Sequence, residues 1–144
     1  MTKQLTSILL FAIISLASMN QVAAASKTEA IFLGMQMAML ELNNLNIDCE
    51  IIGTRGELAC AEETAIELTS YQALNSSINT LLDEVSDIKA ITENYDKELN
   101  DSEIYEINTK LGISLAYINT LKIYGFNDHY SEFKTLIKWS PKAS

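Results

Sequence analysis

Histidine, cysteine and basic residues are scarce in this sequence of 144 residues. It holds one histidine, His129, and two cysteines without Cys-x-x-Cys spacing, which argues against a zinc site and against a redox-active dithiol. The Gly-x-Ser-x-Gly motif of serine hydrolases, the Cys-x-x-Cys-His haem attachment motif and the Asp-rich calcium loop are absent too. We therefore expect a protein that is not an enzyme and that carries no cofactor.

Acidic residues greatly outnumber basic ones. Nineteen Asp and Glu face ten Lys and Arg, so the formal net charge is −9. Such a chain repels nucleic acid and anionic lipid head groups and attracts basic proteins. Asp83, Glu84 and Asp87 lie close together, and the like-charged pair Asp83 and Asp87 destabilises a helix slightly at its spacing of four residues. We expect these three residues to contribute to binding a basic partner; the alternative is that the acidity serves solubility alone.

The first 25 residues have the three-part pattern of a secretory signal peptide. Lys3 gives a positive start, residues 7–19 are apolar and uncharged, and three alanines ending at Ala25 suit a cleavage site. We expect cleavage after Ala25, with Ala24 as the alternative. An uncleaved membrane anchor is less favoured, because the apolar core is shorter than the ~20 residues that span a bilayer.

The predicted mature protein is one domain, residues 26–144, located in the periplasm or secreted. Removal of the first 25 residues takes away one cation, Lys3, and no acid, so the net charge changes from −9 to −10. After cleavage we expect no stable membrane insertion. The oligomeric state stays open, and a homo-oligomer is compatible with the sequence.

Apolar residues recur at steps of three and four over residues 74–99, interrupted only at Thr92. That period places them on one face of an α-helix. We expect the rest of the chain to be organised around this helix. The stripe consists of Leu74, Ile78, Leu81, Val85, Ile88, Tyr95 and Leu99.

The remaining segments predict an all-α fold, a small bundle of four to five helices. One helix is expected over residues 28–43, behind a capping box formed by Ser26 and Glu29. Another is expected over about 101–124 behind a cap formed by Asn100 and Glu103, with Gly112 suggesting a close helix crossing and Gly125 following the last turn. A short helix should end before Pro141. A further helix should begin near Leu58 and stop at residues 75–77, since Asn-Ser-Ser is a poor helix interior. A single helix over residues 60–99 is the alternative.

Cys49 and Cys60 are the natural partners for a disulfide in an exported chain. The bridge would close a small loop between the first two helices. Gly53 and Gly56 lie inside this loop, and we expect it to be irregular, because a lone hairpin is only marginally stable.

Met35, Met37 and Met39 stand out in the first helix, because thioethers are good ligands for Cu(I). Only Met35 and Met39 share a helical face, since Met37 points about 200° away from Met35. Met35 with His129 could instead supply two axial haem ligands. The favoured interpretations are that the methionines fill the core and that His129 is an exposed surface residue.

The sequence thus favours an exported, non-enzymatic protein-binding module in the periplasm, such as an inhibitor, an immunity-type protein or a chaperone-like adaptor. Its binding residues would include Asp83, Glu84 and Asp87, or Met35 and Met39 on the first helix. The alternative function is a small-ligand carrier for a hydrophobe, haem or copper that uses the Met-rich helix.

The signal-peptide pattern generates the first prediction. Mature protein recovered from the periplasm should begin at Ser26 or one residue earlier, and intact-mass measurement checks this. Recovery of the full chain of 144 residues from membranes would contradict it.

Overall fold

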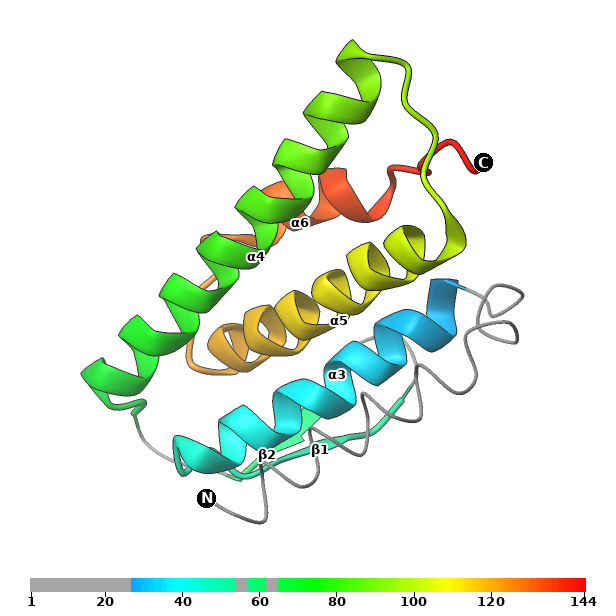
Figure 1. The fold of residues 1–144 in the computed structure, drawn as a ribbon. Helices are drawn as coiled ribbons and strands as arrows, with labels where there is room; N and C mark the ends of the chain where they lie inside the picture. The colour runs from blue at the N-terminus through cyan, green and yellow to red at the C-terminus, as the bar shows by residue number, and fades with distance from the viewer. Residues whose placement is uncertain (1–26, 54–56, 62–64) are drawn as a thin grey trace.

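The computed structural model describes residues 27–53, 57–61 and 65–144. The expected signal peptide, its cleavage site and the N-terminal cap at Ser26 lie outside these residues. The described elements form a helical bundle with a small hairpin (Figure 1). They are, in order, α3 (Lys27–Asn44), β1 (Cys49–Ile51), β2 (Leu58–Cys60), α4 (Leu68–Asn94), α5 (Asp101–Ile123) and α6 (Tyr130–Ile137). The all-α prediction is confirmed.

The central element is α5, not the helix of residues 74–99 that the sequence favoured. α5 lies between α3 and α4, with α6 packed across it (Figure 1). Because α5 is surrounded, it buries polar residues as well as apolar ones. Ser114 and Thr120 donate their hydroxyl hydrogens to the carbonyl oxygens one helical turn earlier, at 3.0 and 2.8 Å, so these buried groups are satisfied within the helix itself.

Two glycines allow α3 and α5 to touch backbone to backbone. A Cβ on Gly34 would collide with the carbonyl oxygen of Thr109, and a Cβ on Gly112 would collide with that of Ile31. The close approach makes this the most extensive contact between any two described elements. The close helix crossing suggested by Gly112 in the sequence is confirmed.

α4 is one helix from Leu68 to Asn94, so the predicted break at residues 75–77 is wrong, and so is the predicted helix start near Leu58. Contacts from the α5–α6 connection hold this part of α4. The ring of Tyr71 packs on Phe126 with a centroid separation of 4.5 Å. Next to it, Asn75 Oδ1 lies 2.5 Å from a ring nitrogen of His129. These tertiary contacts outweigh the low helix propensity of the Asn-Ser-Ser sequence.

The buried face of α4 is rotated slightly from the predicted stripe. Leu82 is fully buried where Leu81 was expected, and Leu81 and Ile88 are half-buried. Thr92 is buried rather than an interruption, and its hydroxyl donates to Lys89 O at 2.9 Å. Tyr95 was expected in the stripe but is 79% exposed.

The three long helices all end in a Schellman motif, with one left-handed residue after the last turn. That residue is Asn46 after α3, Asp96 after α4 and Gly125 after α5, at φ 57°, 48° and 91°. In each case the next amide closes the motif on a carbonyl five residues back, at 2.9 Å. Gly125 was expected in this role. The stop at Asp96 was missed, which is why residues up to Leu99 were assigned to the helix.

The residues around the cysteines form a hairpin rather than an irregular loop. β1 and β2 pair antiparallel with Cys49 opposite Cys60, and the predicted disulfide joins the two. β1 packs on α3 and β2 packs on α5. The bridge and this packing stabilise a hairpin that would be marginal alone.

Residues at the two ends of the described chain meet. Lys27 Nζ donates to the carbonyl oxygens of Ile137 and Trp139, so a lysine at the start of α3 caps the end of α6. Burial lowers the pKa of Lys27. Leu99 N donates to Lys142 O at 2.8 Å, and Ser144 N donates to Leu99 O at 2.9 Å. Residues 142–144 thereby fix the connector between α4 and α5.

The glycine crossing generates a stability prediction. Gly112→Ala should lower the free energy of unfolding by about 1–3 kcal/mol, because the new Cβ forces two backbones apart. The loss should appear although alanine has the higher helix propensity. Urea unfolding measures it. In the control Gly53→Ala, the new Cβ meets only the flexible Glu57 side chain, and its effect should be small. An unchanged or raised stability of Gly112→Ala would contradict the crossing.

The disulfide generates a second stability prediction. The double variant Cys49→Ser, Cys60→Ser should lose about 3 kcal/mol in the loop-entropy model, and its melting temperature should fall. Thermal unfolding with and without reductant checks the effect, because reductant should destabilise only the natural sequence. Two free thiols in native oxidised protein would show that the bridge does not form.

Candidate functional site

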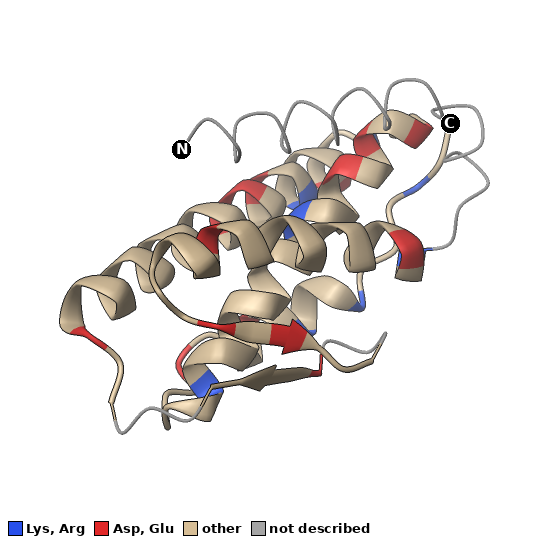
Figure 2. Cartoon of the chain, turned by 90° about the horizontal axis from the view of Figure 1, so that it is seen from below, with Lys and Arg blue, Asp and Glu red and all other residues tan. Residues whose placement is uncertain are grey.

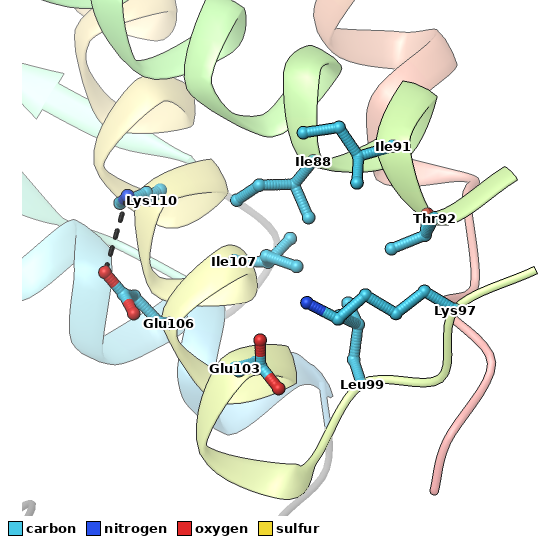
Figure 3. A pocket seen from close by; sticks show the side chains of 9 residues that line it. All are labelled: Ile88, Ile91, Thr92, Lys97, Leu99, Glu103, Glu106, Ile107 and Lys110. Carbon is cyan, nitrogen blue, oxygen red and sulfur yellow. Dashed lines mark ion pairs between the residues drawn. The ribbon is translucent and has the colours of Figure 1, made fainter. Parts of the chain in front are cut away.

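A small pocket opens where the last turns of α4, the connector and the first turns of α5 meet (Figure 3). Its volume is about 140 Å³. Leu99, Ile107 and Thr92 are the buried residues of its lining and form its floor, which is apolar apart from a Thr92 hydroxyl that donates to Lys89 O. The lining residues are Ile88, Ile91, Thr92, Lys97, Leu99, Glu103, Glu106, Ile107 and Lys110.

Two other hollows are larger and more open to solvent. One of about 470 Å³ lies between α3, α5 and α6, and one of about 360 Å³ lies along α4 and α5 beside Ser76 and Tyr117. Each has a single buried side chain in its lining, Phe133 and Tyr117 respectively. Burial, followed by the charge of Glu41, raises the pKa of Tyr117, so its phenol stays neutral. The pocket of about 140 Å³, called the α4–α5 pocket from here on, has three buried residues in its lining and is the better-formed site.

Local structure holds the pocket walls in place. Asn100 caps α5 through its side chain, which accepts from Glu103 N at 2.8 Å, while Glu103 Oε1 accepts from Asn100 N at 3.1 Å. This is the predicted capping box in full. The backbone of Leu99 is held on both sides by residues 142–144. The pocket is therefore built into the fold and does not require a rearrangement.

An ion-pair network forms one rim. Lys110 Nζ lies 2.9 Å from Glu84 Oε2 on α4 and 3.4 Å from Glu106 Oε1 on its own helix. Burial lowers the pKa of Lys110, but its hydrogen bonds to the two carboxylates and their charges outweigh burial and raise that pKa overall. The ammonium stays protonated, and the three groups together carry one negative charge.

The opposite rim carries an unpaired cation. Lys97 reaches from the connector across the mouth, and its ammonium points toward the space between Ile107 and Glu103 (Figure 3). None of the ion pairs in the described part of the chain involves Lys97. The pocket thus combines an apolar floor, one unpaired ammonium group and several carboxylates.

Exposed apolar residues continue from the pocket along α4. Ile91 is 50% exposed and Tyr95 is 79% exposed. Glu84, Ile88 and Ile91 recur at steps of three and four within α4, so they share one flank of the helix, and Tyr95 is the residue that follows its last turn. This flank places an apolar strip beside the carboxylate of Glu84.

The predicted acidic residues lie on the outside of the bundle. Asp83, Glu84 and Asp87 are all exposed on α4. Only Glu84 is part of the network at the pocket rim, through Lys110. Figure 2 shows acidic positions spread over the helices and the hairpin instead of gathered in one patch. The structure therefore separates the three residues into a rim residue and an outward-facing pair.

Met35, Met39 and His129, weighed as candidate metal or haem ligands, have different surroundings. Met35 is completely buried in the core, and Met39 packs against the core while half-buried. His129 is half-buried and interacts with Asn75 through its ring nitrogen, so the expectation that it is an exposed surface residue is corrected. A metal held by Met35 would require the core to open.

Within residues 27–53, 57–61 and 65–144, no group of three or more His, Cys, Asp or Glu side chains is arranged to hold a metal ion. No described helix combines the length and apolar character needed to cross a bilayer.

Comparison with known proteins gave no match to any family model, curated sequence or solved structure. The site must therefore be interpreted from its own chemistry.

The sequence did not predict the pocket, because residues 88–92, 97–99 and 103–110 meet only after the chain reverses at Asp96. No local pattern in the sequence connects these three segments.

Proposed function

We propose that this protein is an exported, non-enzymatic protein-binding module that acts on a basic partner in the periplasm or outside the cell. Inhibitors, immunity-type proteins and chaperone-like adaptors are the classes that fit this description. The signal-peptide pattern of the sequence supports export, and the charged surface of the bundle supports binding.

The carrying observation is the excess of accessible negative charge on a well-packed bundle. No Asp or Glu in the described part of the chain is buried. Asp83 and Asp87 form none of the ion pairs in that part, although they lie one turn apart on α4. Their mutual repulsion is relieved when a positive surface approaches.

A second candidate function, carriage of a small hydrophobe, is favoured by the apolar floor of the α4–α5 pocket. The volume of about 140 Å³ limits such a ligand to roughly the size of benzene. Haem or copper on Met35 and Met39 is less favoured, because Met35 is fully enclosed. Visible absorption and metal content of the purified protein separate carriage of haem or copper from protein binding.

Electrostatic steering generates the functional prediction. A partner is first isolated by pull-down from a periplasmic extract, and association is then followed by surface-binding kinetics. The association rate should fall as ionic strength rises, because the Debye length shrinks from ~30 Å at 0.01 M to ~8 Å at 0.15 M. The double variant Asp83→Asn, Asp87→Asn should slow association in the same way and leave the dissociation rate nearly unchanged.

The matched control is Asp83→Glu, Asp87→Glu, which keeps the charge and should associate at the natural rate. Glu84→Gln is measured separately, because it also breaks the pair with Lys110. An association rate that responds neither to salt nor to the double Asn change would show that the acidity serves solubility alone.

A further inference from the structure

We propose that the α4–α5 pocket receives an aromatic side chain from a basic segment of the partner protein. This inference rests on the proposed protein-binding function and names the contact site and the chemistry that it recognises. Three properties of the site support it: its size, its charges and the apolar surface beside it.

The size of the pocket suits one aromatic ring. An apolar cavity of roughly 150 Å³ holds one benzene molecule, and the pocket measures about 140 Å³. Its floor of Leu99, Ile107 and Thr92 offers no free polar group, since the Thr92 hydroxyl already donates to Lys89 O. A ring therefore gains apolar contact there without leaving a buried donor or acceptor unsatisfied.

Lys97 and the carboxylates determine which residues of the partner can flank the aromatic ring. The Lys97 ammonium lies beside Leu99 and Ile107 (Figure 3). There it can contact the face of an inserted ring in a cation–π interaction. The lining holds two carboxylates, Glu103 and Glu106, and two lysines. Glu84, which pairs with Lys110 from outside the lining, makes the carboxylates three against two. Lysine or arginine on either side of the aromatic residue would meet these carboxylates, whereas acidic neighbours would be repelled.

Ile91 and Tyr95 offer further apolar contact at this end of α4. Ile91 lines the pocket and is 50% exposed, and Tyr95, 79% exposed, follows directly after the end of α4. Apolar residues around a central anchor exclude water from it and thereby strengthen the contact. Because the capping box and residues 142–144 already hold the walls, binding loses little conformational entropy.

Titration of the isotope-labelled full protein with short blocked peptides tests the site directly. The probe has a central phenylalanine between pairs of lysines. One control replaces phenylalanine by alanine, and the other replaces the lysines by glutamates. We expect saturable shifts of the amide signals of Ile88, Ile91, Leu99 and Ile107. Each control should bind about tenfold more weakly or worse, a difference of 1.4 kcal/mol.

Two variants locate the binding. Ile91→Ser should weaken the probe about fivefold or more, as loss of an anchor contact does. Ile123→Ser is the matched control, since Ile123 is 49% exposed at the other end of α5, and should leave binding unchanged. Thr92→Met, which fills the pocket, should remove the shifts at Leu99 and Ile107. Thermal unfolding confirms that each variant is folded.

Several results would overturn the proposal. Equal binding of the phenylalanine and alanine peptides would show that no aromatic ring is inserted and that charge alone makes the contact. Equal binding of the lysine and glutamate peptides would assign the pocket to an uncharged hydrophobe. Absence of shifts in the amide signals at the pocket would show that the peptide does not bind there. If an isolated partner binds in a salt-dependent way but ignores Ile91→Ser and Thr92→Met, the proposed function holds and the pocket proposal fails.

Discussion

The backbone contact between Gly34 and Gly112 is the constraint on which the rest of the bundle depends. It brings α3 close enough to α5 that no side chain fits between them at the crossing. α5 then has α3 on one side and α4 on the other, with α6 across it (Figure 1). A helix enclosed in this way cannot have one polar face and one apolar face. Its hydroxyl groups therefore bond to its own carbonyl oxygens, and its small residues occupy the tightest positions.

The ends of the helices determine where the surface stays open. α4 packs against α5 and α6 along its earlier turns, and the left-handed residue Asp96 then ends it. The Asn100 cap starts α5 four residues later in another direction. This short reversal leaves side chains of the last turns of α4 facing those of the first turns of α5 across a small gap. The pocket is thus a consequence of two helix caps and a connector that residues 142–144 hold in place.

Local signals in the sequence predicted the parts of the fold that depend on local chemistry. The helical periods, the Asn100–Glu103 cap, the glycine after α5 and the cysteine pair are all features of a few neighbouring residues, and the structure contains them. Predictions failed where distant residues decide the outcome. The Asn-Ser-Ser sequence remains helical because Phe126 and His129 contact the turns beside it. A small rotation of α4 buries Leu82 in place of Leu81. The pocket itself joins segments that no local pattern connects.

The structure divides the acidic surface into two kinds of charge that act over different distances. Asp83 and Asp87 face outward, and their field reaches about one Debye length into solvent. They can raise the rate of encounter with a positive surface without touching it. Glu84 and Glu106 instead hold the partly buried Lys110 within a network at the pocket rim. A contact made at that rim would set the lifetime of a complex, since close packing governs dissociation more than long-range charge does. Under the proposed function, the outward pair would attract a basic partner, and the rim would then hold it by an apolar anchor.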